Sequence, residues 1–109
     1  MYYNQVEVCG LLYKPRPIGV FLFCDLKVEK YDPEMDRTYT TYIQVYSKNP
    51  GIISELNRNA NREVFLVGFL ANTSYFSGCQ VYVTNIFTVT GNEYFNVRKA
   101  RNIPANGCK

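Results

Sequence analysis

The spacing of apolar residues along the chain is the feature that most limits what it can fold into. Apolar and polar residues alternate with a period of two in a strand with one buried face, whereas a helix repeats its apolar residues every three or four positions. The strand patterns cover residues 4–13, 18–31, 38–47, 64–70 and 81–86, and the helical pattern covers residues 52–59. The chain is therefore predicted to be all-β, with one short helix between its third and fourth strands.

The predicted helix has both a start signal and a stop signal. Asn49 can act as the N-cap, because its side-chain oxygen accepts hydrogen bonds from the first free N–H groups. Pro50 suits the first helical position, where its missing N–H is not needed. The polar run 57–61, Asn-Arg-Asn-Ala-Asn, is expected to end the helix.

Prolines, acidic residues and glycines mark the connections and the crowded points. Lys14-Pro15-Arg16-Pro17 is expected to form a loop after the first strand, since each proline fixes its own φ and lacks an amide donor. Residues 32–36, Asp-Pro-Glu-Met-Asp, are expected to form an acidic loop after the second strand. Gly10 and Gly68 lie inside strand patterns, which indicates that two backbones approach closely there.

Three strands, one helix and two strands is the element order of the OB-fold, a five-stranded Greek-key barrel. A length of 109 residues suits one such domain. We expect residues 1–90 to form the OB-fold domain and residues 91–109, which lack periodicity and hold Arg98, Lys99 and Arg101, to form a partly flexible basic C-terminal tail. Another small β-barrel or a β-sandwich is the alternative that this pattern leaves open.

The composition argues against catalysis. The chain has ten tyrosines and seven phenylalanines but no histidine, which removes the commonest general base and the commonest metal ligand. No Ser-x-x-Lys motif, glycine-rich phosphate loop or carboxylate cluster replaces it. We therefore expect a protein that is not an enzyme, that needs no cofactor and that has no small-molecule substrate.

The cysteine spacing and the lengths of the apolar runs indicate in which cellular compartment the protein is expected. Cys9, Cys24, Cys79 and Cys108 show no close pairing such as Cys-x-x-Cys, so neither a zinc site nor a disulfide framework is expected. The first twenty residues lack the pattern of a signal peptide, and no stretch approaches the length of a membrane span. We expect a cytoplasmic domain with reduced thiols and no membrane partner.

Three segments resemble parts of bacterial single-stranded DNA-binding proteins. "NQVEVCGLLYKPRP" resembles their first strand, "TYIQVYSK" their third strand, and "EVFLVGFLANTSYFSGCQVYVTNIF" their last hairpin, and the match spans residues 4–90. The end of the chain, Ala-Asn-Gly-Cys-Lys, lacks the acidic tip of that family, which makes the chain similar to its short, tail-less primosomal relative. The resemblance implies a protein that binds single-stranded DNA as a homodimer or homotetramer, in replication, recombination or a mobile element, and that uses strand one as a dimer edge.

The aromatic residues are the expected base-binding groups. The family's stacking aromatics correspond to Tyr46 and Tyr75 and approximately to Tyr31; tyrosine and phenylalanine replace tryptophan here, and any aromatic face can stack on a base. Period two places Tyr42 and Tyr46 on the outward face of the third strand, about 13 Å apart. With Phe76, Tyr75 is expected to form a finger that lies over a nucleic-acid strand.

Each of these aromatics also has a structural interpretation. Tyr42 and Tyr46 can pair across the sheet as ordinary strand residues. Tyr75 and Phe76 can fold back over their own hairpin. Phe21 and Phe23, which share the outward face of the second strand, are expected to pack against a second subunit or the tail rather than against bases.

Cations are the expected phosphate contacts. Lys14 and Arg16 lie in the predicted first loop, and Lys48 closely follows Tyr46. The net charge of +3 permits a polyanion partner without demanding one, and the acidic loop 32–36 argues against a uniformly basic groove. The predicted partner is single-stranded DNA, with single-stranded RNA as a variant and a protein–protein interaction module as the alternative. The predicted nucleic-acid-binding residues are Tyr75, Tyr46, Tyr42, Tyr31, Phe76, Lys14, Arg16 and Lys48.

Overall fold

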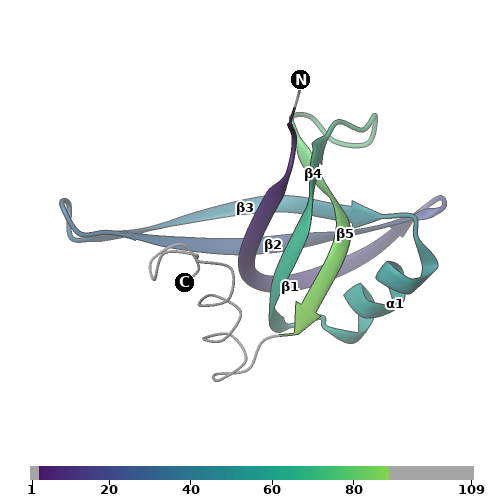
Figure 1. Cartoon of the computed structure of the whole chain (residues 1–109), viewed down its shortest axis with the longest axis horizontal. Helices are drawn as coiled ribbons and strands as arrows, with labels where there is room; N and C mark the ends of the chain where they lie inside the picture. Colours follow the sequence, from purple (N-terminus) through teal and green to yellow (C-terminus); the bar gives the residue numbers. More distant parts are fainter. Residues whose placement is uncertain (1–2, 89–109) are drawn as a thin grey trace.

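The computed structural model describes residues 3–88, which form a closed barrel of five strands with one helix (Figure 1). The strand order around the barrel is β1-β2-β3-β5-β4, and β1 closes it by pairing with β4. Among the paired strands of residues 3–88, β3 and β5 are the only parallel pair. The elements are β1 (Val6–Ile18), β2 (Phe21–Asp32), β3 (Arg37–Ser47), α1 (Pro50–Arg58), β4 (Arg62–Ala71) and β5 (Gln80–Thr88). The predicted OB-fold, with its short helix between β3 and β4, is confirmed.

The main core consists of apolar side chains, almost all aliphatic, from inward-facing positions of all five strands. Leu56 of α1 lies among them, so the helix closes one end of the barrel. Full burial of one such side chain stabilises the fold by about 1.5–3 kcal/mol. Burial raises the pKa of the Cys24 thiol in this core to about 11, so that this thiol stays protonated at neutral pH. The core residues are Leu12, Leu22, Cys24, Leu26, Val45, Leu56, Val64, Leu66, Val81 and Val83.

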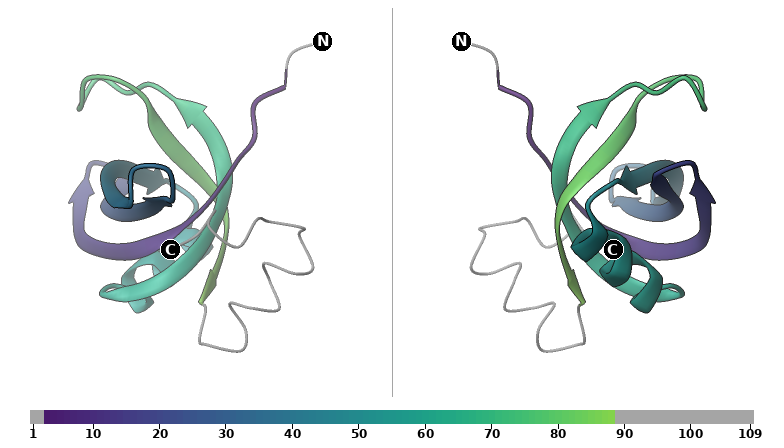
Figure 2. Two further views of the ribbon diagram at one scale, coloured as in Figure 1. Left: turned by 90° about the vertical axis from the view of Figure 1, so that its left-hand side faces the viewer. Right: turned by 90° about the vertical axis from the view of Figure 1, so that its right-hand side faces the viewer.

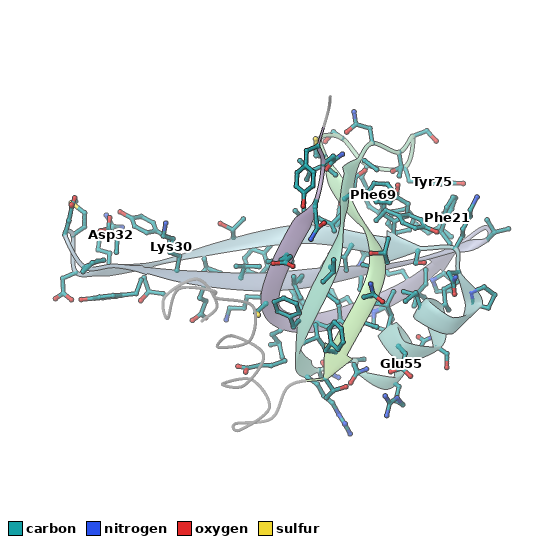
Figure 3. The ribbon with its side chains drawn as sticks, viewed as in Figure 1. Phe21, Lys30, Asp32, Glu55, Phe69 and Tyr75 are labelled. Carbon is teal, nitrogen blue, oxygen red and sulfur yellow. The ribbon has the colours of Figure 1, made fainter. Side chains whose placement is uncertain are left out.

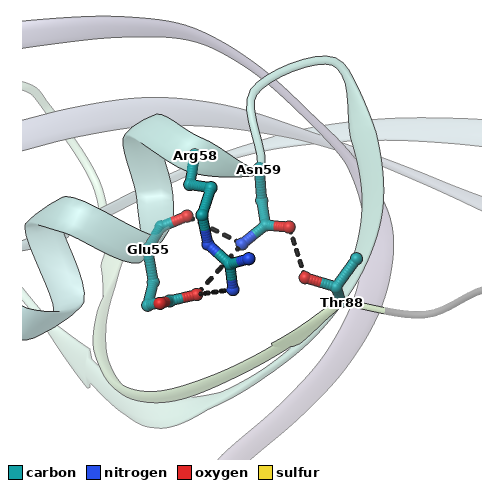
Figure 4. Close-up of polar contacts among 4 residues, drawn as sticks. All are labelled: Glu55, Arg58, Asn59 and Thr88. Atoms are coloured by element: carbon teal, nitrogen blue, oxygen red, sulfur yellow. Dashed lines mark hydrogen bonds and ion pairs between the residues drawn. The ribbon is translucent and has the colours of Figure 1, made fainter.

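Both ends of α1 are fixed by side chains. As predicted, Asn49 is the N-cap, and its side-chain oxygen accepts hydrogen bonds from the N–H groups of Gly51 and Ile52 at 2.9 and 3.3 Å. At the other end, the buried Asn59 side chain donates to the backbone oxygen of Glu55 at 2.8 Å and accepts from the hydroxyl of Thr88 (Figure 4). Asn59 therefore links the helix to the end of β5.

The predicted loop at Lys14-Pro15-Arg16-Pro17 is wrong, because β1 continues through these residues to Ile18. The pairing of β1 with β2 shifts register between Tyr13 and Arg16, and Lys14 takes a positive φ of 53°. Pro15 lies within this bulge. A bulge interrupts the ladder, so a proline without an N–H is tolerated there.

The hairpin of β2 and β3 projects beyond the barrel as an arm (Figure 1). The two strands pair continuously from Leu22–Ser47 to Asp32–Arg37, whereas β2 pairs with β1 only as far as Lys27. In the left view of Figure 2, the arm points at the viewer and the other strands curve around behind it. The acidic residues 32–36 form the tip of this arm.

Disulfides, metal sites and membrane-spanning helices, none of which the sequence predicts, can be assessed only within the described residues. Among residues 3–88, Cys24 and Cys79 are free thiols, and no cluster of cysteines and carboxylates could hold a metal ion. No helix in this range is long and apolar enough to cross a membrane. The expected basic tail, residues 91–109, lies outside the described residues and stays a prediction.

The crowding expected at the strand glycines generates a stability prediction. A Cβ added at Gly68 would lie 2.0 Å from the backbone oxygen of Tyr82, and one added at Gly10 would lie 2.4 Å from that of Lys27. We expect Gly68→Ala to lower the free energy of unfolding by about 3 kcal/mol, because a backbone cannot move aside as a side chain can. Urea unfolding followed by circular dichroism measures this change.

Gly78→Ala is the matched control. Gly78 has a φ of 78°, and an added Cβ would meet no atom within 4 Å. Its substitution should cost only the backbone strain of about 1 kcal/mol. Equal losses for the two variants would show that crowding at Gly68 does not limit the barrel.

Candidate nucleic-acid interface

The outward side chains of neighbouring strands form rows across the barrel. The first row runs from Arg16 on β1 through Phe23 on β2 and Tyr46 on β3 to Tyr82 on β5, each residue facing the next in the strand register. The second row runs from Tyr13 through Asp25 to Gln44. Because directly opposed side chains on one face lie close together, each row is a set of contacts.

The first row is the centre of an aromatic cluster outside the main core. The rings of Phe23 and Tyr46 stack with centroids 4.9 Å apart and planes 9° apart. Phe21 and Tyr82 contact the Tyr46 ring by their edges at 5.6 and 5.1 Å. Burial raises the pKa of Tyr46 above its ordinary value, with a smaller contribution from Tyr82, so the phenol stays neutral.

The loop between β4 and β5 covers this cluster. Tyr75 contacts Phe21 and Phe23 by its edge at 6.2 and 5.8 Å, and Phe76 lies 4.9 Å from Phe23. Figure 3 shows Tyr75 beside Phe21, and Phe69 of β4 stacks on Tyr82 with ring centroids 5.2 Å apart. The aromatic tip therefore folds back over the outer face of β2 and β3, although 48% of Tyr75 remains exposed.

One buried side chain holds the loop in this shape. The amide of Gln80 donates to the backbone oxygens of Ser77 and Gly78 at 3.2 and 3.1 Å. Its oxygen accepts from the N–H and the hydroxyl of Thr73 at 3.1 and 3.2 Å. Both ends of the loop are thus bonded to a single residue. Nothing in the sequence pattern had singled Gln80 out.

A groove of about 430 Å³ lies beside the covered cluster. The rings of Tyr13 and Tyr42 form one wall, in an edge contact at 6.3 Å, and Phe76 belongs to the other. Desolvation raises the pKa of Tyr13, with contributions from Tyr42 and Asp25, so its hydroxyl remains a donor. The lining residues are Tyr13, Asp25, Tyr42, Ile43, Gln44, Phe76, Ser77 and Cys79.

Arg16 connects the floor of the groove to the loop. Its guanidinium forms an ion pair with Asp25 at 3.0 Å and lies over the ring of Phe76, 5.6 Å from the centroid. The bulge at residues 14 and 15 precedes Arg16, which then pairs with Phe23. Arg16 therefore reaches the groove from a strand and not from the expected loop.

Most of the predicted binding residues come together on this face. Tyr42 and Phe76 line the groove, and Tyr75 and Tyr46 belong to the adjoining cluster. The predicted outward direction of Tyr46 is confirmed, but the expected exposure is wrong: only 5% of the residue is accessible, because Phe23, Phe21 and Tyr82 surround it.

The expected partner of Phe21 and Phe23 was a second subunit or the tail. In the structure the β4–β5 loop of the same chain contacts both rings, and Phe23 is fully buried. This contact joins residues more than fifty positions apart, so strand periodicity could not predict it.

Two predicted cations lie at the margins and one predicted aromatic lies elsewhere. The Lys14 ammonium lies 5.7 Å from the Tyr13 ring centre, and the N–H of Lys48 donates to the hydroxyl of Tyr82 at 3.4 Å. Tyr31 lies on the arm, about 20 Å along β2 from Asp25 at the rise of an extended strand. Its hydroxyl donates to Asp36 at 2.6 Å, which raises the pKa of Tyr31. Tyr31 is therefore not part of the groove.

Six of the eight groove residues are absent from the predicted set, and three of them, Tyr13, Asp25 and Gln44, form one row of the sheet. The sequence pattern assigns Tyr13 to the first strand and gives it no role in binding. Asp25 and Gln44 are single polar residues on outward strand faces, and such residues are usually interpreted as exposed to solvent. Only the register, which aligns them in one row, identifies them.

Comparisons with known proteins relate this chain to others through its fold. No protein-family model matches it, and no curated protein matches it. PriB from Ralstonia solanacearum superimposes with a TM-score of 0.64 at 17% identity, over 82% of this chain and all of that one.

Two further solved structures are similar. A small single-stranded DNA binding protein from Mycoplasma pneumoniae has a TM-score of 0.65 at 13% identity, over 83% of this chain and 97% of that one. The Plasmodium falciparum SSB in complex with ssDNA has a TM-score of 0.63 at 8% identity, with the same coverage of 83% and 97%. The resemblance to single-stranded DNA-binding proteins is thus confirmed at the level of the fold.

The covered position of Tyr46 generates a second stability prediction. We expect Tyr46→Ala to lower the free energy of unfolding by about 3 kcal/mol, because it leaves a cavity beneath the loop. Tyr42→Ala is the matched control on the same face of β3, and it should cost less than about 1 kcal/mol because 61% of Tyr42 is exposed. Chemical denaturation measures both. Similar losses for the two variants would contradict the difference in burial.

Proposed function

We propose that this protein binds single-stranded nucleic acid, with DNA as the first candidate, on the outer face of β2 and β3, and that it catalyses no reaction. The groove between the Tyr13–Tyr42 pair and the β4–β5 loop is the observation that carries this proposal. OB-folds bind oligonucleotides on the face of strands 2 and 3, between the loops that flank it. Two of the similar structures are single-stranded DNA-binding proteins, which supports the same class of ligand here.

Exposed aromatic faces supply the attraction for bases. Tyr42 and Tyr75 are 61% and 48% exposed; Tyr42 lines the groove, and Tyr75 belongs to the adjoining aromatic cluster. Stacking of one base on such a ring contributes about 1–3 kcal/mol and tolerates any sequence. The stacked pair of Phe23 and Tyr46 supports the Tyr75 ring, which contacts Phe23. Lys14, Arg16 and Lys48 border this face and would contact phosphates.

We also propose that the protein acts as a homodimer or homotetramer. One OB barrel covers only about 4–16 nucleotides, so an extended strand is held better by several linked barrels. Exposed apolar side chains on β1, β4 and β5 would gain free energy from burial between subunits. They include Leu11, Phe69, Leu70 and Phe87.

Light scattering tests the oligomeric state. At micromolar concentrations the full chain is expected to give the mass of a dimer or a tetramer, because these apolar side chains are covered in the assembly. Leu11→Glu should shift the population toward monomer by placing a charge in the interface, whereas Met35→Glu, at the tip of the arm, should not. A monomeric parent protein would contradict the proposal.

Fluorescence anisotropy with labelled oligo-dT, oligo-U and duplex DNA tests the binding function. We expect oligo-dT to bind and the duplex to bind much more weakly, with oligo-U deciding between DNA and RNA. Tyr42→Ala and Tyr75→Ala should each reduce the affinity for single strands by about 1–3 kcal/mol. Their salt dependence should stay that of the parent, because stacking releases no counterions, whereas Lys14→Ala and Lys48→Ala should flatten it.

Tyr39→Ala is the control for these variants. Tyr39 is exposed like Tyr75 but lies on the arm, opposite Lys30. It should leave the affinity unchanged. If Tyr39→Ala weakens binding and Tyr42→Ala does not, the nucleic-acid strand binds the arm and not the groove. If no single strand binds, the aromatic face is better explained as a surface for another protein.

A further inference from the structure

The floor of the groove carries two side chains that sequence-independent binding does not require. A surface that only stacks bases and neutralises phosphates needs aromatic rings and cations. Asp25 and Gln44 are neither, and a carboxylate repels phosphate. They face each other in the register of β2 and β3, so their side chains lie side by side on the outer face. Their position at the bottom of an aromatic groove suggests contact with the edge of a base.

The hydrogen-bonding capacity of this pair is largely unused. One carboxylate oxygen of Asp25 accepts from Arg16 at 3.0 Å, which fixes the side chain and offsets its charge. Within residues 3–88, neither the second oxygen of Asp25 nor the side-chain amide of Gln44 takes part in a hydrogen bond. A carboxylate only accepts hydrogen bonds, whereas an amide both donates and accepts. The floor therefore offers two acceptors and one donor group.

The walls fix how a base could enter. Tyr13 and Tyr42 stand on one side of the floor, and Phe76 stands on the other. A base that enters edge first can lie against these rings while its Watson–Crick edge points at Asp25 and Gln44. The volume of about 430 Å³ lies within the range of small-ligand sites.

We propose that this groove holds one base of the bound strand and selects guanine against thymine and uracil. The proposal rests on the proposed function and adds a base preference to it. The Watson–Crick edge of guanine presents one acceptor, O6, beside two donors, N1–H and N2–H₂. The amide of Gln44 donates to O6, and the free oxygens of Gln44 and Asp25 accept from the two donors.

The other bases fit the same floor less well. Thymine and uracil place a carbonyl oxygen on each side of one N–H, so that an oxygen faces the Asp25 carboxylate and is repelled. Adenine and cytosine each offer one amino donor and leave part of the floor unpaired. Unpaired buried polar groups reduce affinity, which is how sites built to hydrogen-bond one partner reject another. The expected order is guanine first and thymine or uracil last.

Competition binding to the full chain tests the preference. The probes are a thymidine oligomer and oligomers of the same length in which isolated thymines are replaced by guanine, adenine or cytosine; spacing the guanines avoids quadruplexes. We expect the guanine-bearing strand to bind about tenfold more tightly than oligo-dT, equivalent to 1.4 kcal/mol. Inosine, which lacks the N2 amino group, should lose part of this gain, and 7-deazaguanine, which keeps the Watson–Crick edge, should retain it.

Variants assign the preference to the floor. Asp25→Asn and Gln44→Leu should each bring the guanine-to-thymine affinity ratio close to one, and circular dichroism reports whether they fold. Glu29→Gln is the matched control, because it removes the same charge from the same outward face of β2, where Glu29 forms an ion pair with Lys27. It should keep the parent's ratio.

The outcomes separate the two proposals. Tight binding of every oligomer by the parent protein with equal affinity overturns the base preference and leaves strand binding intact. A preference that survives both floor variants, or that 7-deazaguanine abolishes, also overturns it. Failure of every oligomer to bind overturns strand binding itself.

Discussion

The stacked pair of Phe23 and Tyr46 is the contact on which the rest of the outer face depends. The two residues oppose each other across β2 and β3, so the register of the arm fixes their stack. Because both rings point away from the barrel core, they need a separate cover, and the β4–β5 loop supplies it with Tyr75 and Phe76. Once Phe76 is fixed on Phe23, it becomes a wall of the groove. The contacts that stabilise this face thus also shape the proposed binding groove.

Arg16 joins this apolar construction to the polar floor. The β1 bulge re-registers the strand so that Arg16 faces Phe23, and from there its guanidinium contacts both Asp25 and Phe76. An ion pair of half-buried groups contributes little to stability by itself. Its effect here is geometric: it holds the carboxylate in place between the aromatic walls. A proline-containing bulge therefore positions the charged group of the site.

Features that depend on neighbouring residues, such as strands and helix caps, could be predicted from the sequence. Contacts between segments distant in the sequence could not. Alternation predicted the strands, Asn49 and Pro50 predicted the start of the helix, and element order predicted the barrel. The proline rule failed at residues 14–17 because the sheet tolerates prolines where its ladder is interrupted. Period two gave the direction of Tyr46, but not the loop that covers it, and Gln80 gave no signal because its partners are backbone groups whose positions exist only in the folded loop.

The net charge limits the electrostatic contribution to binding of a nucleic-acid strand on such a surface. Affinity for nucleic acid usually depends on cations that release counterions from phosphates, and this contribution grows with the number of phosphates neutralised. The chain carries a net charge of only +3, its arm ends in the acidic residues 32–36, and one of its groove cations is paired with Asp25. In the proposed binding mode, the electrostatic contribution to the affinity is therefore small for this class of ligand. Stacking and hydrogen bonds to base edges then supply a larger share of the binding free energy, and a surface that relies on base edges is also one that can distinguish between bases.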